Sequence, residues 1–316
     1  MIWAAAALAG GLALPHLWPR RWLAPVTGIA LWLSVLALRA TITAVALIVL
    51  VLYIPATQLF QLITHWCFHA VIPFITVHLG FSGHTLGDAA LLVPALAITV
   101  SATYALYASW RAARLVRSWL RSSSLGVGPK RSVLVGGPEV VVAAAGLVRP
   151  QVVVSTGALT QLDDDELAAG LEHELGHIHR KHRFWALAGR LMHSIARLLP
   201  GSKRAFEELH FHLERDADEY AVRRTGDPLA LAQAICKAAL GDRRHAAAAF
   251  SLAGHVGRAR LGALMERHHQ PGRIVRIGGI GVAVLPAVLA LALLFSAPTI
   301  ASVGLEQATG SVGPHC

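Results

Sequence analysis

The distribution of charge along the chain most constrains its fold. Of the 28 Lys and Arg residues, all except three lie between residues 111 and 276, and so do all except two of the 18 Asp and Glu residues. The remainder of the chain is strongly apolar, and hydrophobic residues make up 55% of the whole. Such a composition is typical of membrane proteins. We therefore expect a polar, basic block between membrane-spanning segments.

Four apolar runs approach or exceed the roughly 17–25 residues that a helix needs to cross a bilayer. They comprise residues 2–18, about 24–63, 88–110 and 277–301. Arg39 interrupts the second run, so two separate helices are an alternative to one long helix. The positive-inside tendency favours one crossing, because it then places Arg20, Arg21 and the Arg cluster after residue 110 on the cytoplasmic side.

This topology predicts three spans within residues 1–110, with an external His-rich loop at 64–87. The polar block, 111–276, is then a cytoplasmic domain inserted before the last span, and 302–316 is a short external tail. The three cysteines form no CxxC pair and are too few for a disulfide framework. By this topology Cys67 and Cys316 both face the oxidising side, and whether they pair stays open. The basic charge marks the cytoplasmic side, because no nucleic-acid motif is present.

The residues that carry chemistry are His173-Glu174-Leu175-Gly176-His177. On a helix the two histidines lie one turn apart and can bind one zinc ion. Glu174 then lies beside the open coordination position, where it can act as general base toward water. The acidic run Asp163–Glu166 supplies an N-cap, a capping-box glutamate and negative charge at a helix start. The motif is therefore predicted to lie on a capped helix.

A zinc peptidase needs a third protein ligand. A second predicted helix, at about 203–224, carries His210, Glu214 and Asp218 at helical spacing. Glu214 is the best candidate for the third ligand, and His210 is the rival. Asp218 suits a partner that orients a ligand imidazole. Taken singly, four histidines of this region are more typical of a surface or a core, namely His179, His182, His210 and His212.

Two further features have open interpretations. His255 or Arg258 can donate to the developing oxyanion of a tetrahedral intermediate, although a surface position at a helix start is equally consistent with His255. Short β-branched runs at 133–135, 140–143 and 148–155 predict strands, and one exposed strand edge can bind an extended peptide. The Ser/Gly-rich residues 122–128 are predicted to be a linker.

These motifs, in this order, resemble those of the gluzincin membrane proteases. The similarity covers roughly residues 130–260 and rests on 152–157, 162–166, 173–182 and Glu214-Arg215-Asp216-Ala217-Asp218. The group includes the HtpX and CAAX-prenyl-protease family and the BlaR/MecR-type signal-transducing peptidases. The resemblance implies an α+β zincin-like domain that binds one Zn²⁺ per chain. A zinc domain before a final membrane helix is similar to the BlaR/MecR type, whose external penicillin-binding sensor does not occur in this sequence.

We therefore expect an α-helical multi-spanning membrane protein with a cytoplasmic zinc endopeptidase domain, located in the plasma membrane. The expected substrate is a polypeptide, such as a transcriptional repressor cleaved in regulatory proteolysis. The expected partners are this substrate and the lipid bilayer, without direct nucleic-acid binding. Two alternatives stay open, namely an HtpX-like quality-control protease and a non-proteolytic metal-binding receptor or scaffold. The sequence does not predict the oligomeric state.

Overall fold

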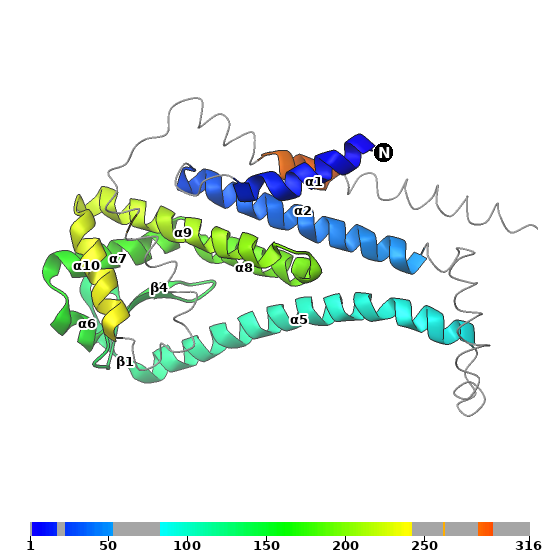
Figure 1. Ribbon diagram of the computed structural model, residues 1–316. Helices are drawn as coiled ribbons and strands as arrows, with labels where there is room; N and C mark the ends of the chain where they lie inside the picture. Colours follow the sequence, from blue (N-terminus) through cyan, green and yellow to red (C-terminus); the bar gives the residue numbers. More distant parts are fainter. Residues whose placement is uncertain (1, 18–22, 53–82, 242–261, 263–283, 293–316) are drawn as a thin grey trace, which may run out of the picture.

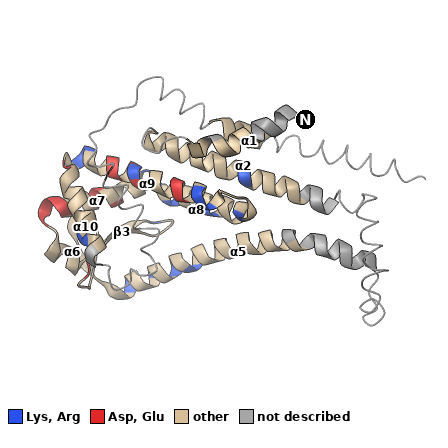
Figure 2. Cartoon of the chain, in the orientation of Figure 1, with Lys and Arg blue, Asp and Glu red and all other residues tan. Residues whose placement is uncertain are grey.

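The computed structural model of the chain describes residues 2–17, 23–52, 83–241, 262 and 284–292. A mixed α/β unit lies at one end, and long helices extend away from it (Figure 1). The strands lie at this end, and Figure 2 shows Lys, Arg, Asp and Glu residues there and on the helices that adjoin it. The α/β content that we expected for the polar block is therefore present.

Three long helices precede the sheet: α1 (Ile2–Leu17), α2 (Pro25–Leu52) and α5 (Gly83–Ser123). Successive members of this set run in opposite directions (Figure 1). Within the described part of the chain, one helix is long and apolar enough to cross a membrane, namely α2 over Pro25–Leu47, with a mean hydropathy of 1.9. It continues unbroken through Arg39, as the one-helix interpretation requires, and residues 53–63 of that predicted span lie outside the described part of the chain. The other three spans stay predictions, and the fourth is described only as helical residues 284–292.

A four-stranded sheet follows α5, with the strand order β1-β2-β4-β3. The parallel pair is β2–β4, and the outer pairs are antiparallel. The strands are β1 (Ser124–Val127), β2 (Val133–Val135), β3 (Val142–Ala145) and β4 (Gln151–Ser155), with a 3₁₀ turn, η4 (Pro129–Arg131), between the first two. The prediction of a linker at 122–128 is wrong, because α5 continues to Ser123 and β1 pairs with β2. Strand pairing here outweighs the loop-like composition.

The helices after the sheet are α6 (Thr156–Gln161), α7 (Asp164–His179), α8 (His182–Ile195), η5 (Ala196–Leu198), α9 (Ser202–Thr225) and α10 (Pro228–Gly241). The predicted start of α7 is confirmed. Asp163 accepts a hydrogen bond from the Glu166 N–H, and the Glu166 carboxylate accepts one from the Asp163 N–H. Helices α8 and α9 form a hairpin that lies between α2 and α5 (Figure 1).

Helix α2 shares a hydrophobic core with this hairpin. Leu31, Val35 and Leu36 of α2 are fully buried, and they cluster with the buried side chains of Leu209 and Leu213 on α9. About half of the most apolar window of α2 is buried in this way. The apolar face of α2 therefore stabilises the position of α9.

Two arginines also bind α2 and the hairpin together. The guanidinium of Arg39 is buried and donates to the carbonyl of Pro200, at the hairpin turn, and to that of Leu12 on α1. Near the other end of α9, Arg215 Nη1 donates to the Leu23 carbonyl over 3.1 Å. Both bonds are charge-assisted and go to backbone oxygens. They therefore fix the position of α2 along its own axis as well as its distance from the hairpin.

The close approach of α2 and α9 depends on Gly28, because a Cβ at this position would collide with the imidazole of His212. We expect Gly28→Ala to lower the free energy of unfolding by about 1–3 kcal/mol through overpacking. Thermal unfolding of the purified protein measures this change. Val26→Ala, at an exposed position two residues earlier, is the matched control. Equal melting temperatures for the two variants would contradict the role given to Gly28.

Candidate metal centre

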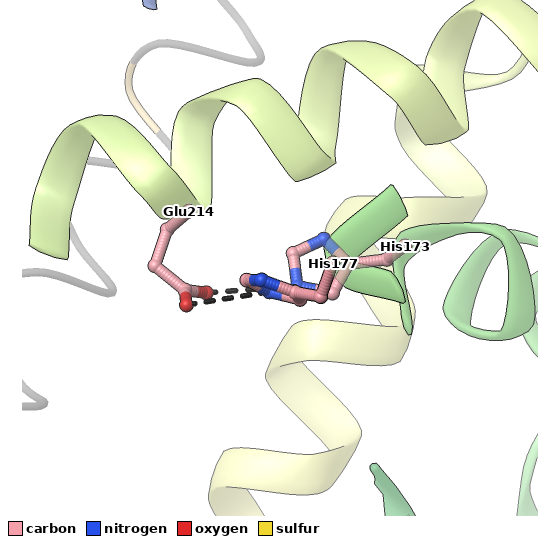
Figure 3. Close-up of side chains that lie close together, drawn as sticks. All are labelled: His173, His177 and Glu214. Carbon is pink, nitrogen blue, oxygen red and sulfur yellow. Dashed lines mark hydrogen bonds and ion pairs between the residues drawn. The ribbon is translucent and has the colours of Figure 1, made fainter. Parts of the chain in front are cut away.

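Three side chains from two helices converge at the α/β end of the molecule. His173 and His177 come from α7 and Glu214 comes from α9, and one ligand atom from each lies within 4.8 Å of the others. Figure 3 shows both imidazoles facing the carboxylate. The two Nε2 atoms are 3.2 Å apart, and they lie 3.5 Å (His173) and 3.4 Å (His177) from the Glu214 carboxylate oxygens.

Local sequence explains this convergence. The spacing of four residues puts both histidines on one side of α7, and the capping box fixes where that helix begins. Gly176, between the histidines, lets α9 come close. A Cβ on it would lie 3.2 Å from the Cβ of Tyr220 and 3.3 Å from the Cα of Ala217. The close packing of α7 against α9 brings Glu214 within reach of both imidazoles.

The three distances fit a tetrahedral metal site. Bonds of about 2.0–2.1 Å at tetrahedral angles give ligand-to-ligand distances of roughly 3.3–3.4 Å. The observed values are 3.2, 3.4 and 3.5 Å. A direct ion pair between imidazolium and carboxylate would be shorter, at about 2.7–2.9 Å. Two imidazoles and one carboxylate are also a usual donor set of catalytic zinc sites.

Each of the two histidines also contacts a further side chain through Nδ1, its other ring nitrogen. Nδ1 of His173 lies 2.9 Å from Oδ1 of the buried Asp218. Nδ1 of His177 lies 2.9 Å from Nδ1 of His182, and Nε2 of His182 lies 3.0 Å from Oδ2 of Asp216. Asp218 thus occupies the place that the helical spacing predicts for it. His182 and Asp216 were not expected here.

The Asp216 carboxylate is held in its charged form. Burial by itself raises the pKa of this carboxyl, but the hydrogen bond with His182 and the charge of Arg180 outweigh it and hold the pKa below its ordinary value. The Arg180 Nη1 atom lies 3.6 Å from Oδ1 of Asp216. Because the folded state lowers this pKa, the carboxylate stabilises the fold at neutral pH, and this contribution is lost as the pH falls through the lowered value.

Glu174 faces the edge strand of the sheet. Its Oε2 atom accepts a hydrogen bond of 2.7 Å from the Ala144 N–H on β3. Glu174, His173 and His177 line a cavity of about 790 Å³ between β3, α7, α9 and α10. Apolar residues of β3, α7, α9 and α10 also line the cavity, namely Val142, Gly170, Ile178, Leu213, Leu231, Ala234, Ile235 and Ala238.

The remaining candidates are placed as follows. His210 lines the same cavity outside the group of three ligands, and burial lowers its pKa. His179 is exposed and stacks on Tyr220. His212 is fully buried against α2. His255, Arg258, Cys67 and Cys316 lie outside the described residues, whereas Cys236 is exposed on α10.

The profile of Peptidase family M48 matches residues 111–206. The matched region includes the sheet and the His173–His177 motif, and it ends before Glu214. No curated protein and no solved structure matches the chain. The family match supports a metallopeptidase and does not distinguish the BlaR/MecR type from its relatives.

Replacing one ligand tests the metal centre directly. We expect Glu214→Ala to weaken zinc binding by more than about 100-fold, because loss of a mere outer partner already costs roughly 10–100-fold. Competition with a chromophoric chelator measures the affinity. The control is Glu219→Ala, which removes a carboxylate from the same helix that pairs instead with Arg223. Equal affinities in the two variants would exclude Glu214 as a ligand.

Proposed function

We propose that this chain is an integral membrane zinc endopeptidase that hydrolyses peptide bonds on the cytoplasmic side of the membrane. In this proposal His173, His177 and Glu214 hold one Zn²⁺, and Glu174 is the general base. The observation that carries the proposal is that Glu174 faces the edge of β3 while its helix presents the two ligand histidines beside it. A general base between a metal site and a free strand edge suits metal-assisted peptide hydrolysis.

A bound Zn²⁺ would polarise the scissile carbonyl and make water more acidic. The carboxylate of Glu174 takes a proton from the attacking water, whose oxygen forms a bond to the carbonyl carbon. The same carboxyl group then gives that proton to the amide nitrogen as the C–N bond breaks. The products are a new carboxyl terminus and a new amine, and Glu174 returns to its charged state.

The substrate backbone is proposed to lie along β3 as an added strand. In the antiparallel register with β4, Val142 pairs with Val154 and Ala144 with Val152. The Ala144 N–H points away from β4 toward Glu174. Residues two apart share an orientation in a strand, so the N–H of Val142 points the same way. An extended peptide can therefore bond to Val142 beside the general base.

The membrane location rests on the apolar helices. Helix α2 meets the length and apolarity of a span, and α5 exposes a series of large apolar side chains that suit lipid: Val93, Leu96, Val100, Tyr104 and Trp110. The part of α5 next to the sheet carries Arg111, Arg114, Arg117 and Arg121, and Figure 2 shows cations on this part of the helix. Cations at that end favour a cytoplasmic position for the peptidase domain.

The biological substrate is proposed to be a regulatory protein such as a transcriptional repressor, as for the BlaR/MecR type. The order of a zinc domain before a final apolar run, 277–301, supports this assignment. Cleavage of many unrelated membrane proteins would instead indicate quality control of the HtpX kind. Regulatory cleavage and quality control are distinguished by the new protein termini in the proteome, compared between cells with active enzyme and cells with inactive enzyme.

Glu174→Gln removes the general base and keeps the size of the side chain. We expect this variant to retain zinc and to lose peptide hydrolysis by about 10²–10⁴-fold or more, the usual contribution of general-base catalysis. Cleavage of a peptide library by the purified protein measures activity, and elemental analysis measures zinc. Glu172→Gln serves as the control, because Glu172 lies on the same helix as Glu174 but its carboxylate binds Lys130 of the η4 turn. Full activity of Glu174→Gln would refute the mechanism.

Val142→Pro tests the strand-addition model, because proline removes the outward N–H of this edge residue. We expect a loss in kcat/KM of about 5-fold, corresponding to roughly 1 kcal/mol for one hydrogen bond. Val142→Ala keeps the backbone N–H and controls for loss of the side chain. Zinc content is measured in both variants. The model would fail if proline and alanine reduced kcat/KM equally.

A further inference from the structure

We propose that His182 and Asp216 form a relay that positions the imidazole of His177 for metal binding. Here the term relay denotes the hydrogen-bonded series His177–His182–Asp216. The inference rests on the proposed metal centre, and it assigns a role to two residues outside the ligand set. Both are positioning residues, because they would act on the metal only through His177.

The geometry of the relay is continuous. Nδ1 of His177 lies 2.9 Å from Nδ1 of His182, and Nε2 of His182 lies 3.0 Å from Oδ2 of Asp216. His182 and Asp216 are each 3% exposed. Water is therefore largely excluded from the bond between His182 and Asp216, and a hydrogen bond in such surroundings orients its partners more strongly than one at the surface.

One arrangement of protons satisfies the relay when His177 is a metal ligand. A ligand nitrogen must present its lone pair, so Nε2 of His177 carries no proton and the neutral ring keeps its proton on Nδ1. That N–H donates to Nδ1 of His182, which accepts. The proton of the neutral His182 ring is then on Nε2, where it donates to the Asp216 carboxylate. Each bond thus has one donor and one acceptor.

The two ligand histidines are therefore held in different ways. Asp218 contacts His173 directly, over 2.9 Å. The Nδ1 atom of His177, on the ring side away from Glu214, is linked to the Asp216 carboxylate through the imidazole of His182. This difference follows from α9, because Asp218 shares a face with Glu214 at a spacing of four residues, whereas Asp216 is rotated away from that face. His182 bridges the resulting gap between Asp216 and His177.

The corner between α7 and α8 places His182 for this role. Lys181 adopts the left-handed conformation, with a φ of 57°, and α8 begins at the next residue. In a continued α7, residue 182 would lie about 140° around the axis from His177, since each residue turns the helix by roughly 100°. The break turns the chain out of the α7 axis, and His182 then lies against the ligand. Arg180, in the same corner, lies 3.6 Å from Asp216 and holds its charge.

Zinc affinity in three variants tests the relay. His182→Leu removes the acceptor that His182 offers to the Nδ1–H of His177, and we expect zinc to bind about 10–100-fold more weakly. The amide of Gln can accept from His177 and donate to Asp216, so we expect His182→Gln to restore most of the affinity. His179→Leu is the matched control, because His179 belongs to the same corner but bonds to the Leu175 carbonyl instead.

The readouts separate the relay from a purely structural contact. Affinity is measured by chelator competition, and the melting temperature of the zinc-free protein is measured alongside it. Wild-type zinc affinity in His182→Leu overturns the relay, and so does a drop in zinc-free melting temperature with unchanged affinity. If His182→Leu does not fold, Asp216→Asn decides. Weakening by about 10-fold supports the relay, and unchanged affinity overturns it.

The same assay distinguishes failure of the relay from failure of the metal centre. Zinc loss in Glu214→Ala together with wild-type affinity in His182→Leu and His182→Gln leaves the metal centre intact and removes only the relay. Unchanged zinc affinity in Glu214→Ala removes the metal centre, and the relay with it.

Discussion

The close packing of α7 against α9 is the constraint on which the rest of the molecule depends. Neither helix carries a complete ligand set, since α7 supplies two imidazoles and α9 supplies the carboxylate. Gly176 sets how near they come, because its missing side chain leaves room for the backbone of α9 at Ala217. Other elements serve this pair. The sheet contacts α7, and α10 contacts both α7 and α9.

The sequence was sufficient for features that depend on local spacing. The start of α7 follows from Asp163 and Glu166, because the side chain of each residue accepts a hydrogen bond from the backbone N–H of the other. Helical periodicity likewise placed Glu214 and Asp218 on one face of the second helix. These predictions needed no knowledge of the tertiary fold, because a helix alone determines which side chains share a side.

Contacts across the corner between α7 and α8 were beyond that reasoning. His182 looked like a surface or core histidine, because its bond to His177 exists only after Lys181 turns the chain. Asp216 was passed over because it does not share the face of Glu214. The role of α2 was hidden for a different reason. The sequence pattern of an apolar helix is the same whether lipid or protein covers it. The pattern around Leu31 and Leu36 therefore did not indicate that they pack on α9.

The burial of α2 against the hairpin means that the folded unit around the candidate metal centre is discontinuous in sequence. The region matched by the M48 profile begins at residue 111, yet part of the core under α9 comes from residues 23–36. A fragment that begins at residue 111 would retain all three candidate ligands. It would lack Leu31, Val35 and Leu36, which pack against α9. Its hairpin would expose an apolar surface to water, which favours aggregation. The helix that meets the requirements of a membrane span is thus also a structural part of the unit that holds the candidate ligands.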